Sequence, residues 1–203
     1  MVRTHGWGGH TPADDQEAVD RILDVVEGEI EQRGASIRIA DIARALGISR
    51  QTVYNYFPGP DALVEAAAFR SGVRFLQPLA AHLAEITDPV DALVESLAFT
   101  LEWLPGDRPV QVMLAHDFTK ASAGITSDAC VRFGHTLLTG LDVDWSELGL
   151  RDADLDDLVE YLLRILQSFM ADPGRPPRRG TLLRGYLRRW VAPVLRAEIA
   201  AHR

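Results

Sequence analysis

The segment from Ile48 to Leu63, ISRQTVYNYFPGPDAL, concentrates side chains that form directional hydrogen bonds. Arginine, glutamine and asparagine pair with base edges in the major groove of DNA, whereas hydroxyl groups bind phosphate oxygens. A short helix that buries Val53 and Phe57 would turn the polar side chains outward. These are Arg50, Gln51, Thr52, Tyr54, Asn55 and Tyr56. The chemistry predicted for this segment is recognition of a nucleic acid.

Three residues with small or branched side chains predict how that helix is positioned. Ala43 is followed four residues later by Gly47, and six residues after that by Val53. Two helices that cross steeply need a small side chain at their closest approach, a glycine in the turn and an aliphatic side chain from the second helix. The sequence therefore predicts a helix-turn-helix with helices at 39–46 and 50–56, and Ser49 is placed to cap the second helix.

The charge of this segment differs from that of the whole chain. The 203 residues carry a net charge of -8, with an isoelectric point near 5.2. Between residues 34 and 57, three arginines (Arg38, Arg44 and Arg50) stand against the single acid Asp41. An acidic surface repels a polyanion, so any contact with DNA must be local.

Several functional classes find no support in the sequence. The single cysteine, Cys130, excludes an intramolecular disulfide and a multi-cysteine metal site. The first 15 residues contain no apolar block typical of a secretory signal, so we expect none, and no apolar run approaches the roughly 20 residues that span a membrane. His116 and Asp117 are adjacent on a predicted helix, so their side chains diverge by about 100° and do not orient one another. We expect a cytoplasmic protein that is not an enzyme and has no cofactor and no metal site.

Hydrophobic periodicity predicts an all-α fold. A first helix contains Val19, Ile22, Leu23, Val26 and Ile30 and ends at Gly34. Pro78 is expected to kink or split the long helix that starts near Asp61, and Asp88 is expected to cap the next one, with Pro89 in its first position. Later helices are predicted near 109–120, 127–141, 154–171 and 179–201.

The stretch IADIARALGISRQTVYNYFPGPDALVEA resembles the DNA-binding segment of the TetR family of transcriptional repressors, with DIA, LGIS, TVY and YF in register. The resemblance is specific over about residues 15 to 70 and architectural beyond them. Residues 1–11 hold three glycines and two histidines with little apolar content, which predicts a flexible tail. The resemblance implies a three-helix DNA-binding domain at 12–58 and an effector-binding and dimerisation domain at 59–203. It also implies a homodimer formed through the last two long helices.

The family motif assigns expected roles to individual residues. By resemblance, Thr52, Tyr54 and Tyr56 anchor the DNA backbone, while Arg50, Gln51 and Asn55 contact bases. For each tyrosine, packing against the helix remains an alternative. Ser49 and Arg38 complete the predicted DNA-binding set.

Two positions depart from the family pattern. Arg38 stands where the family usually has a serine or threonine cap, so either the cap moves to Ser36 or Arg38 reaches a phosphate. Pro60 stands where the family often has a lysine that anchors DNA. Its presence predicts one phosphate contact fewer per subunit and a weaker dependence of binding on salt.

A helical domain that responds to a small molecule is expected to hold a cavity lined by aromatic residues and a few polar groups. Ordinary core packing is the alternative for each candidate. The predicted ligand-binding residues are Phe99, Trp103, Met113, His116, Phe118, Phe133, His135 and Tyr161.

Two apolar stripes near the C-terminus predict the dimer interface, as a four-helix bundle with two-fold symmetry. Burial of both stripes within one chain is the alternative. Arg184, Arg188 and Arg189 are expected to face solvent or to pair with Asp152, Asp156 or Asp157. The predicted interface residues are Leu155, Leu158, Leu162, Leu166, Leu183, Leu187, Trp190 and Val194.

The resemblance implies a ligand-responsive repressor. We expect it to bind a palindromic operator in double-stranded DNA as a homodimer and to be released by a small, largely apolar molecule. The alternative is a ligand-sensing or protein-interaction module that is derived from a helix-turn-helix protein and binds no specific DNA.

Overall fold

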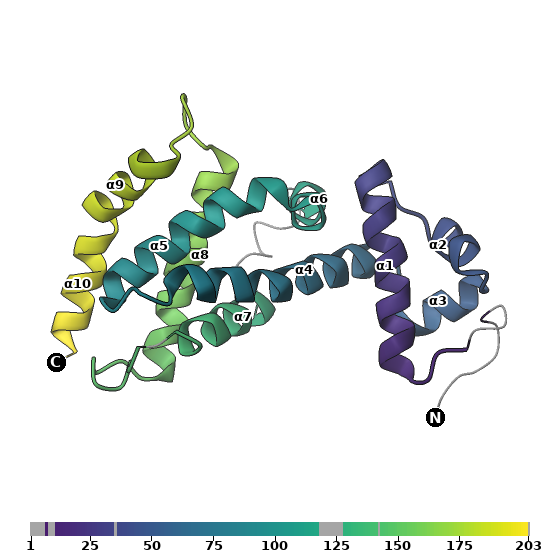
Figure 1. The fold of residues 1–203 in the computed structure, drawn as a ribbon, viewed down its shortest axis with the longest axis horizontal. Coiled ribbons are helices and arrows are strands. Elements are labelled where there is room, and N and C mark those ends of the chain that lie inside the picture. The colour runs from purple at the N-terminus through teal and green to yellow at the C-terminus, as the bar shows by residue number, and fades with distance from the viewer. Residues whose placement is uncertain (1–6, 8–10, 35, 118–127, 142, 203) are drawn as a thin grey trace. The chain divides into compact units, whose positions relative to one another are not determined.

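The computed structural model describes residue 7 and residues 11–34, 36–117, 128–141 and 143–202; at 113–117, 128 and 129 it describes the backbone alone. All regular structure within these residues is helical, which confirms the predicted all-α fold (Figure 1). The described residues form two compact units, and each unit has a core of its own. The first contains the chain up to Val73 together with α6, and the second contains the remainder.

Five helices build the first unit. They are α1 (Asp15–Arg33), α2 (Ile39–Leu46), α3 (Arg50–Tyr56), the first part of α4 (Pro60–Leu83) and α6 (Arg108–Asp117). Asp14 caps α1 by accepting a hydrogen bond from the Glu17 amide at 2.7 Å. Gly34 ends this helix with a φ of 61°, where glycine is favoured, as the sequence predicts.

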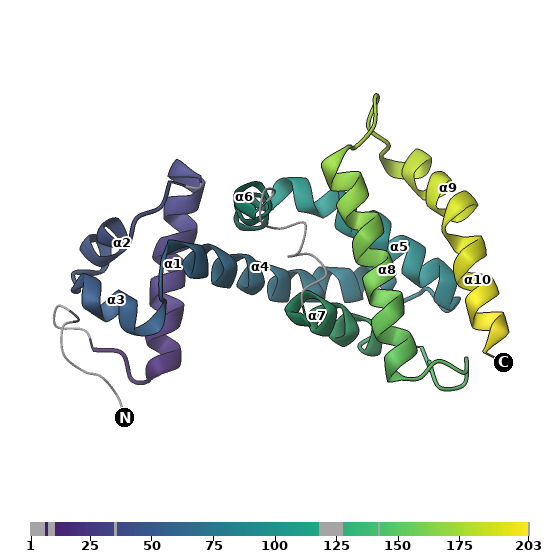
Figure 2. The same cartoon turned by 180° about the vertical axis from the view of Figure 1, so that it is seen from behind.

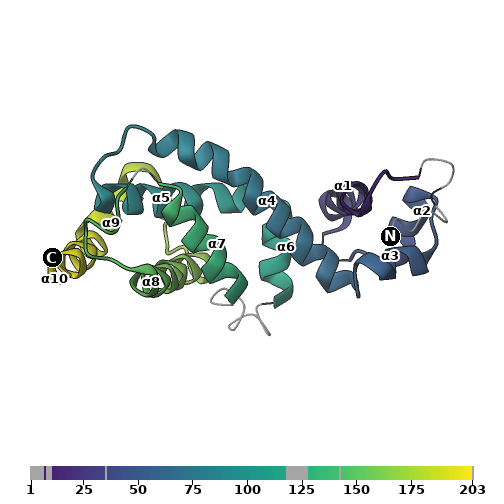
Figure 3. The same ribbon diagram turned by 90° about the horizontal axis from the view of Figure 1, so that it is seen from below.

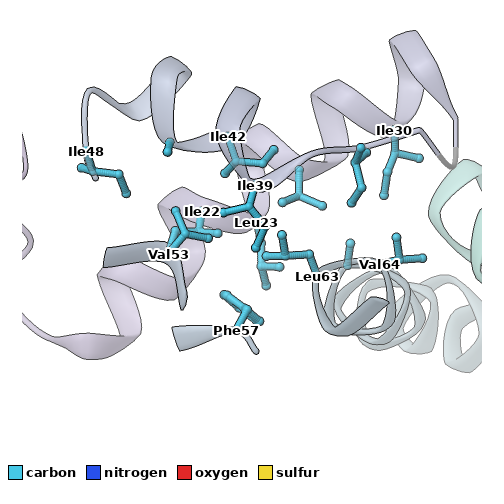
Figure 4. Packing of buried hydrophobic residues seen from close by; sticks show 14 of the residues in the cluster. Ile22, Leu23, Ile30, Ile39, Ile42, Ile48, Val53, Phe57, Leu63 and Val64 are labelled. Carbon is cyan, nitrogen blue, oxygen red and sulfur yellow. The ribbon is translucent and has the colours of Figure 1, made fainter. Parts of the chain in front are cut away.

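The core of the first unit lies where α1, α2, α3 and α4 meet (Figure 4). The buried face of α1 matches the predicted periodicity, except that Ala18 is buried and Val19 is only partly buried. Trp7, which the sequence analysis assigns to the tail, is buried in this core, as is Val112 of α6. The core of the first unit thus includes apolar side chains that lie before and after residues 12–58 in the sequence, one of them on α6.

Five further helices belong to the second unit together with the end of α4. They are α5 (Pro89–Trp103), α7 (Asp128–Thr139), α8 (Asp152–Ala171), α9 (Gly180–Trp190) and α10 (Ala192–Ala201), with a 3₁₀ turn at Leu104–Gly106. Asp88 caps α5 by accepting a hydrogen bond from the Asp91 amide at 2.8 Å, and Pro89 occupies the first turn, as predicted. Helices α8, α9 and α10 all pack against α5, and α7 packs against α8 (Figures 2 and 3).

Two prolines behave differently from the sequence-based expectation. Pro78 lies inside α4, which continues through it, so of the two predicted outcomes the split is wrong and the kink stays a prediction. The predicted helix at 179–201 is instead divided into α9 and α10 at Val191, with Pro193 in the first turn of α10. A proline lacks the amide proton that a continuous helix would use, and its ring clashes with the carbonyl four residues earlier. At Pro193 these effects are avoided because a new helix begins.

Candidate nucleic-acid interface

The turn between α2 and α3 has the geometry that its sequence predicts. Gly47 adopts a left-handed conformation, with φ 66° and ψ 28°. The Ile48 amide donates to the Ala43 carbonyl at 2.9 Å and so closes the turn. Ala43 and Val53 are both buried in the shared core, as the helix-turn-helix pattern requires. This turn fixes the direction in which α3 leaves the core.

Ser49 begins α3 by capping it. Its hydroxyl accepts a hydrogen bond from the Thr52 amide at 3.0 Å and lies 2.8 Å from the Thr52 hydroxyl. Thr52 is only 8% exposed, so it is not presented outward as the sequence analysis expects. The reason is that Thr52 faces the cap in the first turn of α3, where its hydroxyl is held by Ser49.

The outward face of α3 carries four side chains. Arg50, Gln51, Tyr54 and Asn55 are exposed, and Tyr54 has 48% of its surface accessible. The Gln51 amide nitrogen donates to the Asn55 side-chain oxygen at 3.3 Å, which aligns two amides one helical turn apart. An arginine and two amides on one short helix can form hydrogen bonds with base edges in a major groove.

Whereas Tyr54 is exposed, Tyr56 is half-buried. Its ring packs partly buried against the first core, and its hydroxyl donates to the Asp15 carboxylate of α1 at 3.2 Å. The ring of Tyr56 therefore packs against the core, and its predicted contact with the DNA backbone stays a prediction. No feature of the local sequence indicates this contact, because Asp15 lies 41 residues away in the chain.

The three arginines of this segment differ in their surroundings. Arg44 donates to Asp41 at 2.7 Å, and this hydrogen bond holds the pKa of the Asp41 carboxyl below its usual value. Arg38 and Arg50 are exposed and form no ion pair within the described residues. Arg38 occupies the N-cap position of α2, but its side chain makes no capping hydrogen bond. Two guanidinium groups therefore remain available to an anionic partner.

Pro60 occupies the first position of α4, where a helix tolerates proline. The Leu63 amide donates to the Gly59 carbonyl at 3.3 Å, so the helix begins immediately after the Pro58–Gly59 turn. The residue that replaces the family's usual lysine is therefore part of a regular helix start.

A family model described as bacterial regulatory proteins, tetR family, matches residues 22–67 of the chain. HTH-type transcriptional regulators from two Mycobacterium tuberculosis strains are each 30% identical over 189 residues, which is 92% of this chain and 89% of theirs. This chain belongs to the TetR family of transcriptional regulators. The TetR family repressor AlkX from Dietzia sp. strain DQ12-45-1b, implicated in biodegradation of n-alkanes, shares the fold with a TM-score of 0.63 and 22% identity. That alignment covers 89% of this chain and 96% of AlkX.

These relatives are regulators rather than enzymes, which agrees with the sequence-based expectation. The matched family segment contains all of α2 and α3, so the interface described above is the family's helix-turn-helix. No helix in the described part of this TetR-family chain has the length and apolar content needed to cross a membrane.

The predicted ligand-binding residues do not form one group within the described side chains. Phe99 and Trp103 pack around Phe75 of α4, with ring centroids 5.6 Å and 4.3 Å from it. His135 lies 2.8 Å from the Asp156 carboxylate. Tyr161 belongs to a different apolar cluster, and Phe133 is half-buried on α7. Phe118 and the side chains of Met113 and His116 lie outside the described residues.

The predicted dimer residues separate into two groups. Leu155, Leu183 and Leu187 are buried by neighbours in their own chain, so they offer almost no surface to a partner. Trp190 and Val194 are 59% and 51% exposed. Leu158, Leu162 and Leu166 of α8 are half-buried.

Acidic residues of α5, rather than those of α8, pair with the arginines of α9. Arg184 donates to Glu95 at 2.7 Å and to Glu102 at 3.0 Å, and Arg188 donates to Glu95 at 2.9 Å. The expected pairing with Asp152, Asp156 or Asp157 is wrong, because α9 packs against α5. Burial would raise the pKa of the Glu95 carboxyl, but the hydrogen bond and charge of Arg184 outweigh it and lower this pKa.

Proposed function

We propose that this TetR-family regulator is a repressor that binds a palindromic operator as a homodimer and is released by a small, largely apolar molecule. The observation that carries the proposal is the division of α3 into two faces. Val53 is buried in the core, while Arg50, Gln51 and Asn55 are exposed on a helix whose start is fixed by the Gly47 turn and the Ser49 cap.

Base reading is assigned to Arg50, Gln51 and Asn55. An arginine that pairs bidentately with guanine, or an amide with adenine, discriminates between bases by about 1–3 kcal/mol. Arg38 and Tyr54, both exposed, are assigned to phosphates, which position the protein without specifying sequence. Tyr56 and Thr52 support α3 from behind through Asp15 and Ser49.

Response to an effector requires a link between the helices that bind DNA and the rest of the chain. Within the first unit, the buried Ser71 of α4 donates to the Asp107 carboxylate, and Asp107 caps α6 through the Val110 amide at 2.9 Å. Arg70, the neighbour of Ser71, pairs with Glu27 of α1 at 2.9 Å. A displacement of α6 or α4 would therefore be passed to α1.

An effector can release DNA only if it binds more tightly to the arrangement of the dimer that is incompatible with the operator. The aromatic group of Phe75, Phe99 and Trp103 is an apolar region that α4 shares with α5 in the second unit. Because α4 also carries Arg70 and Ser71, we assign this group to effector sensing.

The alternative, a module without specific DNA binding, is favoured by the net charge of -8 and by Pro60 in place of a lysine. The two functions are separated by fluorescence anisotropy with the DNA that flanks the protein's own gene, at two salt concentrations. We expect Asn55→Ala to weaken specific binding by about 10- to 100-fold, as the loss of one base contact does.

The matched control is Gln32→Ala, which removes an exposed amide near the end of α1 and is expected to leave affinity unchanged. Tyr54→Phe should weaken binding to operator and to unrelated DNA alike, because it removes a phosphate contact. Absence of binding at low salt would overturn the repressor and support the alternative module.

A further inference from the structure

A groove of ≈ 260 Å³ lies between α8 and α10, with α5 beneath it. Its apolar floor includes Leu93, Leu158 and Leu195, and its rim carries Asp154, Asp157 and Glu198. Asp154 accepts a hydrogen bond from the Arg151 amide at 2.9 Å and also pairs with the side chains of Arg151 and His202. Glu198 lies 3.7 Å from the His202 imidazole. The groove is therefore apolar inside, and Asp157 is the rim carboxylate that has no ionic partner within the described part of the chain.

The size of this groove favours a side chain over a separate ligand. Cavities that enclose drug-sized molecules measure about 300–1,000 Å³, and this groove lies below that range. Val194 lines the groove and is half exposed, so the groove opens onto the surface of α10.

An apolar side chain of the right kind is exposed on the same part of the chain. Trp190 is 59% exposed at the end of α9, and the Arg189 guanidinium lies 5.0 Å from the centroid of its ring. One indole with a positive charge beside it complements an apolar groove with an acidic rim. A tryptophan is also the residue type that most often dominates the energy of a protein interface.

The α9 surface leaves room for another helix to approach. Gly185 lies on the exposed face of α9, and a Cβ atom added there would meet nothing within 4 Å. Glycine within a helix costs about 1 kcal/mol relative to alanine. Among the described residues, no atom occupies the space that this glycine leaves.

We infer that the occupant of the groove is Trp190 of a second copy of this chain, with Arg189 facing the rim acid Asp157. This inference rests on the proposed homodimer and specifies how its two copies fit together. In an isologous interface, each copy gives its indole to the other, so two equivalent contacts form.

The spacing along the chain agrees with a two-fold axis beside Val194. Antiparallel packing of α10 about that residue brings the start of α10 in one copy, next to Trp190 at the end of α9, toward the later part of α10 that lines the groove in the other copy. Val194, which is half exposed, would then contact the same residue of the partner copy.

The test measures the dimer dissociation constant of the full chain by sedimentation velocity. We expect Trp190→Ala to raise it by about 100-fold, as the loss of a central interface tryptophan does. The control is Phe69→Ala, which truncates an exposed aromatic of α4 in the first unit and is expected to leave dimerisation unchanged. Equal dissociation constants for the Trp190→Ala variant and wild type would overturn the inference.

Charge reversal and crosslinking test the same contact in other ways. Arg189→Glu and Asp157→Arg should each weaken the dimer, and the double variant should restore it. In a Cys130→Ser background, Val194→Cys should form a disulfide between copies. If wild type is dimeric but neither result is obtained, the seating of Trp190 is wrong while the proposed dimeric repressor stands. If wild type is monomeric at every concentration and on operator DNA, the proposed dimer itself is wrong.

Discussion

Helices α1–α3 and helices α9–α10 use their exposed surfaces differently. In α1–α3, Tyr54 is the large hydrophobic side chain that is exposed among the described residues, and polar groups surround it on α3. In α9–α10, Leu182, Trp190 and Val194 are all exposed. The first surface is suited to a charged, hydrated partner such as DNA, and the second to burial against protein. The two regions also differ in how their charges are placed. The charged pair of Asp41 and Arg44 near α3 is exposed, whereas the Glu95 carboxylate between α5 and α9 is buried.

The largest effect is expected from breaking the core behind α3. Ile42 is fully buried, and Ile42→Ala should lower the free energy of unfolding of the first unit by about 4 kcal/mol through the cavity that it leaves. Hydrogen exchange measured along the chain should show loss of protection in α1–α3 and little change in α8–α10. Equal loss in both would show that the two units do not have separate stability.

The matched control for this change is Val73→Ala. Val73 is a half-exposed aliphatic residue of α4 in the same unit, so its truncation should cost about 0.5 kcal/mol or less. A cost as large as that of Ile42→Ala would contradict the assignment of the core.

A somewhat smaller effect is expected at the buried charges of the second unit. Glu95→Gln takes from Arg184 and Arg188 the carboxylate that they share, while Glu102 and Asp91 remain as their other partners. Breaking a buried ion pair on one side costs about 3 kcal/mol, so the cost here should be no larger than that. The measurement is denaturant unfolding at pH 7. As the comparison, Glu160→Gln removes an exposed partner of Arg164 and should have almost no effect.

The acid dependence of this effect follows from the lowered pKa of Glu95. A depressed pKa in the folded state gives stability that is fully present above the ordinary value near 4.5 and is lost as the pH falls through the lower folded value. The difference in stability between wild type and Glu95→Gln should therefore shrink as the pH falls below about 4.5. A difference that stays constant down to pH 3 would contradict the ion-pair explanation.

Removing the cap of α3 is expected to have the next smaller effect on stability. Ser49→Ala removes the hydrogen bond to the Thr52 amide and should destabilise the first unit by about 1 kcal/mol. Because the Thr52 hydroxyl also loses its neighbour, DNA binding should weaken more than the loss in stability alone explains. Thermal unfolding and anisotropy of the same sample separate the two. Ser49→Asp retains a capping oxygen and should retain stability.

The smallest effect concerns the exposed pair near α3. The pKa of Asp41 is lowered by its hydrogen bond with Arg44, so its contribution is also lost as the pH falls. Solvent screens this exposed pair, and Asp41→Asn should shift the melting temperature much less than Glu95→Gln does. Raising the salt concentration should abolish the shift for Asp41→Asn alone. Equal shifts for the two variants would remove the contrast between the two units.

The bounds of α2 and α3 agree with the prediction because their signals are local. The Gly47 turn, the Ser49 cap and the buried Ala43 and Val53 lie within a few residues of one another, and each has one main structural use. The start of α5 was predictable for the same reason, since Asp88 and Pro89 are adjacent to the helix that they begin.

Contacts between distant segments were not predictable from the sequence. Tyr56 reaches Asp15, and Arg184 reaches Glu95, across 41 and 89 residues. The two prolines show a related limit. Pro78 is accommodated within a helix of 24 residues, whereas Pro193 starts a new one, and the proline rule alone does not distinguish these outcomes.

The shared carboxylate of Glu95 has a consequence for how this sequence can change over generations. Replacing Glu95 first takes from Arg184 and Arg188 the carboxylate that they share, and replacing Arg184 first leaves the buried Glu95 with only Arg188 and His82, so these single substitutions pass through a weakened protein. The three positions are therefore expected to be inherited together or exchanged together. Close relatives should have either an acid at position 95 with arginines at 184 and 188, or uncharged residues at all three.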